Sequence, residues 1–357
     1  MNRLLGHIAA LVLTGVILTG CAFDDEVREL RSSSNHDESL AITFANGVID
    51  KPIVTRATTL LSDHMNTMGV WGWQTTPLGA VERIFLNQKV TFNAPEAKWT
   101  YSPLKYWENN STYKFVAYAP HASSVPGVTA SIDSVTRAIS IKGVTLSGSN
   151  TITAGMPVSP AKFDSVPDTD WMIDRFGQSM VGMNRSQVTF SMQHILSKIC
   201  VRVTRSATFL PDSVMPMTLD SIKITSLVSQ GDFAQSIHND SIGILSEWTP
   251  VDTLPRYAIT SAKNVSIPDS ALYVIESLMI PQTVDDSQYI RIWYSIGGDN
   301  SYKGRFYYVF KLSDVFSRFI AGRNYLLTLI IGPEAITFDS GVSGWDDGGS
   351  HGVNINN

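Results

Sequence analysis

Short runs in which apolar and polar residues alternate recur along most of the chain. Such alternation is typical of β-strands with one buried face, because successive side chains of a strand point to opposite sides. Many of these runs are rich in β-branched and aromatic residues, which favour strands. The strands predicted in this way cover residues 41–44, 70–73, 113–118, 139–141, 199–203, 222–224, 289–296, 306–310 and 325–331.

Clusters of Gly, Pro, Asn, Asp and Ser separate these runs and supply the backbone conformations that turns require. Helical periodicity is scarce. The best candidate is 313–321, where Ser313 or Asp314 would cap a turn or two before Gly322 ends it. The pattern therefore predicts an all-β protein built of β-sandwiches, with a weak boundary near residue 185. We expect an N-terminal β-sandwich domain at 40–185 and a C-terminal one at 186–357.

The one long apolar run stands at the amino end and stops at Cys21. It extends from Leu4 to Leu18, follows Arg3, and is shorter than the ~20 residues that a membrane-crossing helix needs. A small residue, Gly20, precedes the cysteine. These features predict a lipoprotein signal peptide at 1–20, cleaved so that Cys21 becomes the acylated first residue. The acidic stretch 21–39 would then be a tether at the outer membrane.

Composition narrows the possible functions. Removal of 20 residues from 357 leaves 337, enough for two domains that each bury a core. The net charge of −5 offers no basic footprint for nucleic acid. Only Cys200 remains beside the lipidated Cys21, so no intrachain disulfide is expected, and Cys200 is interpreted as a small core residue.

No catalytic or metal-binding motif emerges from the sequence. The seven histidines lack partners at the spacing of a metal or nucleophile site, and His194 is interpreted as a packed, hydrogen-bonded core residue. The carboxylates of Asp346 and Asp347 lack the ligand spacing of a calcium loop, so a turn is expected there. We predict a protein without enzymatic activity, cofactor or metal.

An aromatic cluster in the first half supports an alternative function. Flat aromatic faces bind sugar rings, so this cluster would suit a surface glycan-binding lipoprotein. Aromatic residues at strand positions are, however, more often core residues. The cluster comprises Trp71, Trp73, Trp99, Tyr101, Tyr106 and Trp107.

Several local patterns, in order along the chain, resemble the fimbrillin family of Bacteroidales surface proteins, the FimA- and Mfa-like type V pilins. Each motif is weak alone, and the resemblance rests on their order and spacing. The segment 190–199 is similar to the family's His-Ala-Leu-Ser-Lys motif, with Ile195 in place of alanine. The other matching segments are 42–44, 54–57, 99–107, 113–120, 280–282, 322–325, 336–338 and 344–345.

The resemblance implies a surface lipoprotein of two transthyretin-like, fimbrillin-like β-sandwich domains that serves as a stalk, anchor or tip subunit of fimbriae and supports adhesion. In polymerising members a protease cuts after an arginine, the first strand leaves, and a strand of another subunit replaces it. Arg56 is where this cleavage would fall, with Arg28 and Arg31 as rivals in the tether. The implied partners are other fimbrial subunits, the outer membrane through the lipid, and a host or bacterial surface receptor.

Two features remain open on sequence grounds. Residues 336–338 begin like a donor strand, but Gly341, Gly344, Gly348 and Gly349 then weaken it. Seven Asp-Ser/Thr-aliphatic tripeptides resemble an O-glycosylation signal, although Asp-Ser is also a common turn starter. Their acceptors would be Ser134, Ser165, Ser213, Ser221, Ser241, Thr253 and Ser270.

Overall fold

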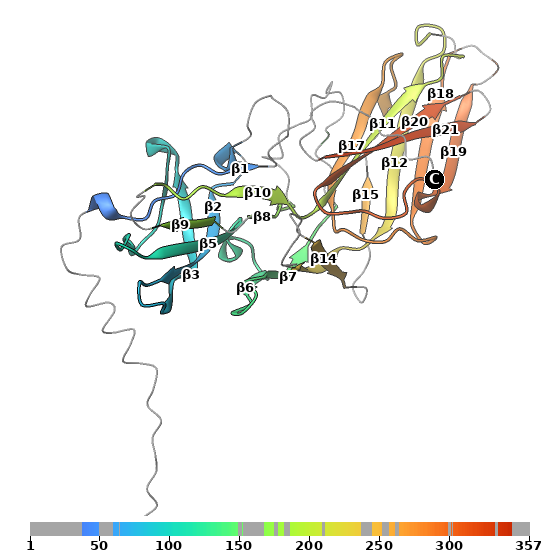
Figure 1. Cartoon of the computed structure of the whole chain (residues 1–357). Coiled ribbons are helices and arrows are strands. Elements are labelled where there is room, and N and C mark those ends of the chain that lie inside the picture. The colour runs from blue at the N-terminus through green and yellow to red at the C-terminus, as the bar shows by residue number, and fades with distance from the viewer. Residues whose placement is uncertain are drawn as a thin grey trace, which may run out of the picture.

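The computed structural model describes residues 38–49, 60–63, 65–148, 152, 168–174, 178–181, 186–208, 211–236, 245–251, 257–260, 264–298, 301, 303–332 and 335–344. These residues form an all-β fold, as predicted, and their helices are short 3-10 turns (Figure 1). None of the helices in these ranges has the length and apolar character needed to cross a membrane. The 3-10 turns are η1 (Glu38–Leu40), η2 (Leu61–Asp63), η3 (Ala94–Glu96), η4 (Ala122–Ser124) and η6 (Leu312–Asp314).

The first sheet has eight strands in the order β1-β10-β8-β5-β2-β3-β4, with β9 also paired to β5. Its pairs are antiparallel except for β1 on β10, which is parallel. The predicted runs at 70–73 and 113–118 lie in β2 and β5. The strands are β1 (Val48–Ile49), β2 (Thr67–Thr75), β3 (Val81–Asn93), β4 (Lys98–Thr100), β5 (Thr112–Ala119), β8 (Met172–Asp174), β9 (Gln178–Val181) and β10 (Ser191–His194).

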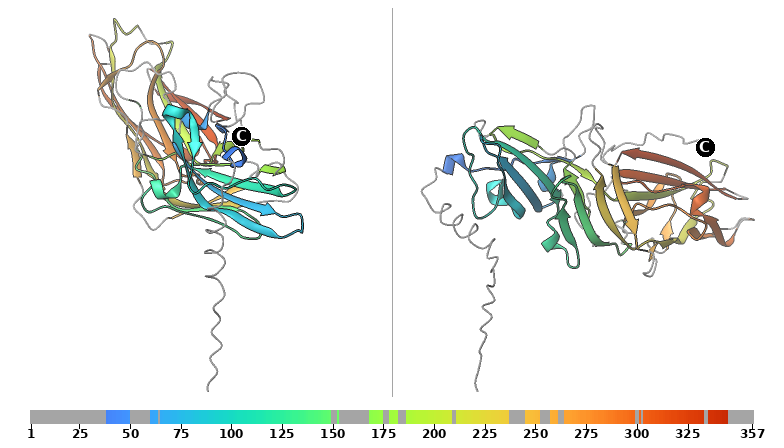
Figure 2. Two further views of the ribbon diagram at one scale, coloured as in Figure 1. Left: turned by 90° about the vertical axis from the view of Figure 1, so that its left-hand side faces the viewer. Right: turned by 60° about the horizontal axis from the view of Figure 1, so that its bottom comes forward.

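A second sheet, here called the bridging sheet, joins strands from both halves of the sequence. Its order is β14-β13-β7-β6, and β13 pairs antiparallel with β7 from Gln230↔Thr145 to Ala234↔Ser140. Figure 1 and the right view of Figure 2 show it between the first sheet and the remaining strands. The strands are β6 (Thr129–Ile132), β7 (Ile139–Thr145), β13 (Gln230–Ser236) and β14 (Leu245–Pro250).

The remaining strands form two sheets packed face to face, here called the second sandwich. One sheet has the order β17-β11-β20-β21, and the other has β15-β12-β18-β19 with β16 also on β12. The strands are β11 (Ser197–Arg205), β12 (Met217–Leu227), β15 (Tyr257–Thr260), β16 (Val265–Ser266), β17 (Leu272–Met279), β18 (Tyr289–Ile296), β19 (Gly304–Lys311), β20 (Arg323–Ile331) and β21 (Ile336–Gly344).

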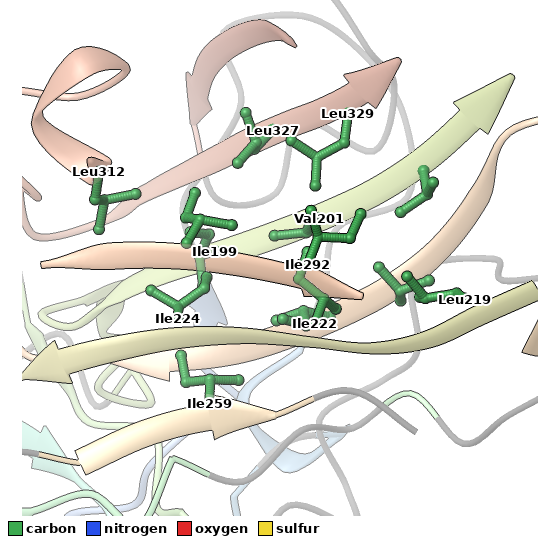
Figure 3. Packing of buried hydrophobic residues seen from close by; sticks show 14 of the residues in the cluster. Ile199, Val201, Leu219, Ile222, Ile224, Ile259, Ile292, Leu312, Leu327 and Leu329 are labelled. Atoms are coloured by element: carbon green, nitrogen blue, oxygen red, sulfur yellow. The ribbon is translucent and has the colours of Figure 1, made fainter. Parts of the chain in front are cut away.

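Alternation along these strands produces the core of the second sandwich. Ile222 and Ile224 of β12 and Ile292 of β18 point toward Val201 of β11 and Leu327 of β20, and all five are fully buried (Figure 3). The intervening residues of β18 are only partly buried, as expected for a strand with one face in a core. Burial of such aliphatic side chains, at about 25 cal/mol per Å² of apolar surface, is the main source of stability for a sandwich.

The two central strands of the first sheet, β2 and β5, carry buried apolar residues on both of their faces. Val70 and Phe115 lie in one core cluster, while Trp71 and Tyr118 of the same two strands lie in another that includes Phe233 of the bridging sheet. Gly69 permits this packing, because a Cβ at that position would lie 2.1 Å from the Tyr118 ring.

Strand pairing crosses the boundary that we predicted at residue 185. The strand β10 belongs to the first sheet, and the bridging sheet draws β13 and β14 from beyond the boundary. Leu278 and Ile280 pack in the same cluster as Trp71, and the indole N–H of Trp248 donates to the Ile195 carbonyl at 2.6 Å. The first and bridging sheets thus contain strands from both sides of residue 185, and one of their core clusters includes Leu278 and Ile280. The division at 185 stays a prediction.

The expected helix at 313–321 is wrong beyond its first residues. Only the 3-10 turn η6 forms, and it spans Leu312–Asp314. Phe316 and Phe319 are buried against the ring of Tyr325, and the backbones of Phe319 and Gln282 exchange two hydrogen bonds. Core packing and this backbone pairing therefore hold the segment extended where local propensity favoured a helical turn.

Candidate functional site

The amino-terminal segment, residues 40–49, inserts between two other parts of the chain. On one side the Ile42 N–H donates to the Lys105 carbonyl at 2.8 Å, and the Trp107 N–H donates to the Leu40 carbonyl at 2.9 Å. On the other side the Val188 N–H donates to the Thr43 carbonyl at 2.8 Å. The segment therefore uses backbone groups on both of its sides, as an internal strand does.

These contacts close the first sheet into a ring. Phe44 forms an antiparallel bridge with Trp99 of β4, one end strand of the sheet, and a parallel bridge with Val188, which leads into β10 near the other end. Beyond this point the segment continues into β1, where the Val48 N–H donates to the Phe190 carbonyl at 3.1 Å. Without the segment, the ring would open and leave two strand edges without partners.

Three buried side chains anchor the segment in the ring. Ile42, Phe44 and Ile49 are 0%, 3% and 1% exposed, and they belong to the core cluster that the ring encloses. The Phe44 ring stacks on Phe190 with ring centroids 5.8 Å apart and meets Phe115 edge-on at 6.3 Å. The alternation of residues 42 and 44 thus marks a segment that fills its own enclosed core, as the sequence indicated.

Polar side chains hold the segment at two further points. The Tyr101 hydroxyl donates to the Ile42 carbonyl at 2.7 Å, and burial raises the pKa of Tyr101, which keeps the hydroxyl protonated as a donor. Asn46 accepts hydrogen bonds from the Trp99 indole N–H at 3.3 Å and from the Ser62 backbone N–H at 3.1 Å. Both points involve the segment itself, so they would be lost with it.

Gly47 lets the segment lie close to its neighbour. A Cβ at this position would lie 3.1 Å from the Phe190 carbonyl oxygen, tighter than most real Cβ contacts. The Leu61 N–H donates to the Gly47 carbonyl at 2.8 Å, and Leu60 forms an antiparallel bridge with Val48. The chain therefore comes back to pair with the end of the segment at Leu60.

The two predicted processing residues, Cys21 and Arg56, lie outside the described residues. Arg56 falls in the sequence between Ile49, the end of β1, and Leu60, where the description resumes. A cut after Arg56 would separate the segment covalently from everything that follows it. The backbone bonds, the three buried anchors and the hydrogen bonds of Tyr101 and Asn46 would then hold it.

The aromatic cluster that would have suited a sugar site is mostly core. Trp71, Trp73, Trp99 and Trp107 are each at most 5% exposed. They pack against both faces of the first sheet, so their ring faces do not form an open platform. The glycan-binding interpretation of this cluster is therefore wrong, because the strands turn these rings inward.

The interpretations of His194 and Cys200 as core residues are confirmed. The His194 Nδ1 lies 2.7 Å from the Asp170 carboxylate, and both residues are buried. Burial raises the pKa of the Cys200 thiol to about 12, which leaves it protonated and unreactive at neutral pH. The described residues hold no group of three or more His, Cys, Asp or Glu side chains arranged to bind a metal.

The family model "Fimbrillin-like" matches residues 55–345 of the chain. The chain belongs to the fimbrillin-like family. Among solved structures, a fimbrial protein from Bacteroides vulgatus is 16% identical, with a TM-score of 0.56, 85% coverage of this chain and 99% of that one. The tip fimbrial protein Mfa3 from Porphyromonas gingivalis, with a C-terminal truncation, is 8% identical, with a TM-score of 0.37 and coverages of 79% and 95%. None of the curated proteins matches by sequence.

The sequence motifs of this fimbrillin-like chain did not reveal how the ring closes. The segments 42–44 and 99–107 were both singled out, and the structure brings them together around Tyr101. The third participant, residues 188–190, was expected to begin the second domain. Apolar residues alternate with a polar one at Val188 and Phe190, which indicates a strand at 188–190. Alternation does not identify the strand with which it pairs.

Proposed function

We propose that this fimbrillin-like chain is a surface lipoprotein subunit of fimbriae that assembles by strand exchange at the ring. The observation that carries the proposal is the amino-terminal segment, which is paired on both sides and buried at Ile42, Phe44 and Ile49. Acylation at Cys21 would anchor the newly exported chain in the outer membrane, and cleavage after Arg56 would free the ring from that anchor.

Loss of the segment would leave a site suited to another extended strand. The Lys105 and Val188 carbonyls and the Trp107 and Val188 N–H groups would lose their partners, and an apolar trough would open where Ile42 and Phe44 had been. A donor strand satisfies such groups by main-chain hydrogen bonds and fills the trough with alternate side chains. We infer that another fimbrial subunit provides this strand.

The strand β21 is engaged in its own sandwich. It pairs with β20 over nine residues, from Arg323↔Gly344 to Ile331↔Ile336, and Phe338 stacks on Phe310 with ring centroids 5.6 Å apart. Donation of this strand would therefore open the second sandwich. We propose that the chain acts as an acceptor within a stalk, anchor or tip position, and that in oligomers of the chain itself β21 leaves this pairing to serve as the donor strand.

The decisive experiment is limited proteolysis of the full chain in detergent with an arginine-specific protease. Cleavage at Arg56 should give a new amino terminus at Ala57 and higher oligomers, measured by amino-terminal sequencing and light scattering. Arg56→Ala should stay monomeric under the same treatment. Arg31→Ala is the matched control and should assemble like the unaltered chain. A product cut at Arg56 that stays a stable monomer would contradict the acceptor role.

Membrane anchoring has a separate test. Cys21→Ala should incorporate no acyl label in cells, because the thiol that forms the thioether is missing. Cys200→Ala is the control and should be labelled normally. Label in the Cys21→Ala variant would remove the lipoprotein assignment and leave the ring proposal untouched. A host or bacterial surface receptor for the assembled fimbria remains part of the proposal.

The four described candidates for O-glycosylation differ in setting. Ser134, Ser213 and Ser270 are exposed, while Ser221 lies partly buried on β12. Asp133 accepts backbone hydrogen bonds from Val135 at 2.9 Å and Thr136 at 2.6 Å, which is the turn-starting role of an Asp-Ser pair. We propose modification at the exposed sites. An intact mass equal to that of the lipidated polypeptide would dismiss it.

A further inference from the structure

The outer face of the β15-β12-β18-β19 sheet carries an ordered set of side chains outside the core. Ile222, Ile224 and Ile292 point inward, so the residues between them point outward. The pairing registers place these outward residues in rows across three strands. One row is Ser221–Trp293–Tyr307, and the next is Lys223–Arg291–Val309.

Two aromatic rings form the centre of this face. Trp293 and Tyr307 stack with ring centroids 4.8 Å apart and an interplanar angle of 30°, and Tyr307 is 49% exposed. Among the described residues, β19 is the last strand of its sheet, so no described strand lies beside Tyr307 on its far side. On the near side the row ends in Ser221, whose side chain is small. This pair differs from the buried tryptophans of the first sheet, because it lies on a solvated face.

Cations without carboxylate partners surround the aromatic pair. Within the described part of the chain, Lys223, Arg291 and Arg305 form no ion pair, and the Arg291 Nε has no hydrogen-bond partner. Other cations of the second sandwich are paired. Arg205 lies 3.1 Å from Asp212, and Lys311, at the end of this face, lies 2.6 Å from Asp286.

This face carries a positive charge, whereas the whole chain has a negative net charge. Among the described residues, Asp220 is the acidic group beside the rows, and the Ser295 hydroxyl donates to it at 2.7 Å. The three unpaired cations therefore outnumber it in a chain whose net charge is −5. An anionic ligand is favoured at such a place, and Arg in particular binds carboxylate and sulfate groups through paired hydrogen bonds.

We propose that this face binds an acidic oligosaccharide. A sugar ring would lie against Trp293 and Tyr307, its carboxylate or sulfate would meet Arg291 and Lys223, and the Ser221 hydroxyl would bond to ring hydroxyls. A protein partner fits less well, because Tyr307 and Val309 are the large exposed apolar residues of these rows, too few for the buried centre of an interface. The proposal does not depend on strand exchange at the ring.

The test is calorimetric titration of the full chain in detergent with defined probes. Oligogalacturonate tests carboxylates, chondroitin sulfate adds sulfate, dextran is the neutral control, and polyglutamate tests charge alone. We expect at least one acidic saccharide to bind about tenfold more tightly than dextran and polyglutamate, since stacking and ion pairing then add. Equal affinity for polyglutamate, or for dextran, would overturn the proposal.

Variants locate the binding on the face. Trp293→Ala and Arg291→Gln should each weaken it about tenfold, whereas Trp293→Phe, which keeps a flat ring, should retain most of it. Tyr307→Ser replaces Trp293→Ala if the latter unfolds, because Tyr307 is half exposed. Phe338→Ala and Lys98→Gln are matched controls, exposed but outside the face. Unchanged affinity in all the face variants would place the saccharide elsewhere and refute the site.

Discussion

The ring of the first sheet and the second sandwich achieve closure in different ways. The core of the second sandwich comes entirely from residues at or after Ile199, in a chain that is continuous downstream of Arg56. The ring needs Ile42, Phe44 and Ile49, which lie upstream of Arg56. One cut can therefore remove part of one core and leave the other intact. The proposed exchange of the segment would therefore change the core of the ring and leave the core of the second sandwich as it is.

The largest expected effect is that of Phe44→Ala. Removal of this ring leaves a cavity against Phe190 and Phe115, and such Phe→Ala changes cost about 3–5 kcal/mol. Hydrogen exchange should show lost protection around Val188 and Lys105 and unchanged protection in β12 and β18. Phe316→Ala, a buried ring of the second sandwich, is the control and should reverse this pattern. Equal loss in both regions would mean that the cores do not behave separately.

A smaller effect should follow Gly69→Ala. The added methyl group would meet the Tyr118 ring, so the ring or the strand β2 must shift, at about 1–3 kcal/mol. We expect a lower denaturation midpoint of the first sheet. Gly304→Ala, whose Cβ would have nearest contacts at 3.7 Å, is the matched control and should change the midpoint little. A Gly69→Ala variant as stable as the unaltered chain would contradict the tight packing.

Tyr101→Phe should weaken the hold on the segment. It removes the hydrogen bond to the Ile42 carbonyl, worth about 1 kcal/mol, together with the bond that the hydroxyl accepts from the Lys105 N–H, and leaves the aromatic ring in place. After cleavage at Arg56, the freed segment should dissociate faster, measured as the rate of oligomer formation. Tyr307→Phe, on the second sandwich, should leave this rate unchanged. The same rate for both variants would show that the hydroxyl does not retain the segment.

Cys200 should have the smallest effect. Its contribution to the free energy of unfolding changes only at alkaline pH. Burial raises the pKa of the Cys200 thiol from 9.0 to about 12. The protonated thiol therefore stabilises the fold below pH 9, and this contribution to the free energy of unfolding is lost as the pH rises from 9 to 12. Denaturant midpoints should fall less steeply across this range in Cys200→Ala than in the unaltered chain. Iodoacetamide should label native Cys200 poorly at pH 9. Rapid labelling of the folded chain would show that the thiol is accessible.

The sequence predicted the positions of the strands better than it predicted which strands pair with each other. The run at 289–296 was predicted as a strand with the bounds that β18 has, and every second residue of it is buried. Residues 188–192 alternate as well, but alternation does not specify which sheet a strand joins. Their pairing with the first half depends on contacts between residues far apart in sequence. Four of the tryptophans illustrate the same limit, since composition alone could not separate core rings from surface rings.

The bridging sheet also affects the order in which strands can pair during folding. β7, which carries β6 on its other side, pairs with β13, and β1 pairs with β10, so the first half of the chain waits for strands that are made much later. A chain that leaves the cell amino end first must hold β2 and β5 unfinished until residue 250 has emerged, while its apolar faces stand open. In the second sandwich β11 likewise waits for β17 and β20, which follow the bridging sheet in the sequence. A factor that shields unfinished strands would therefore meet the open faces of the first half earliest.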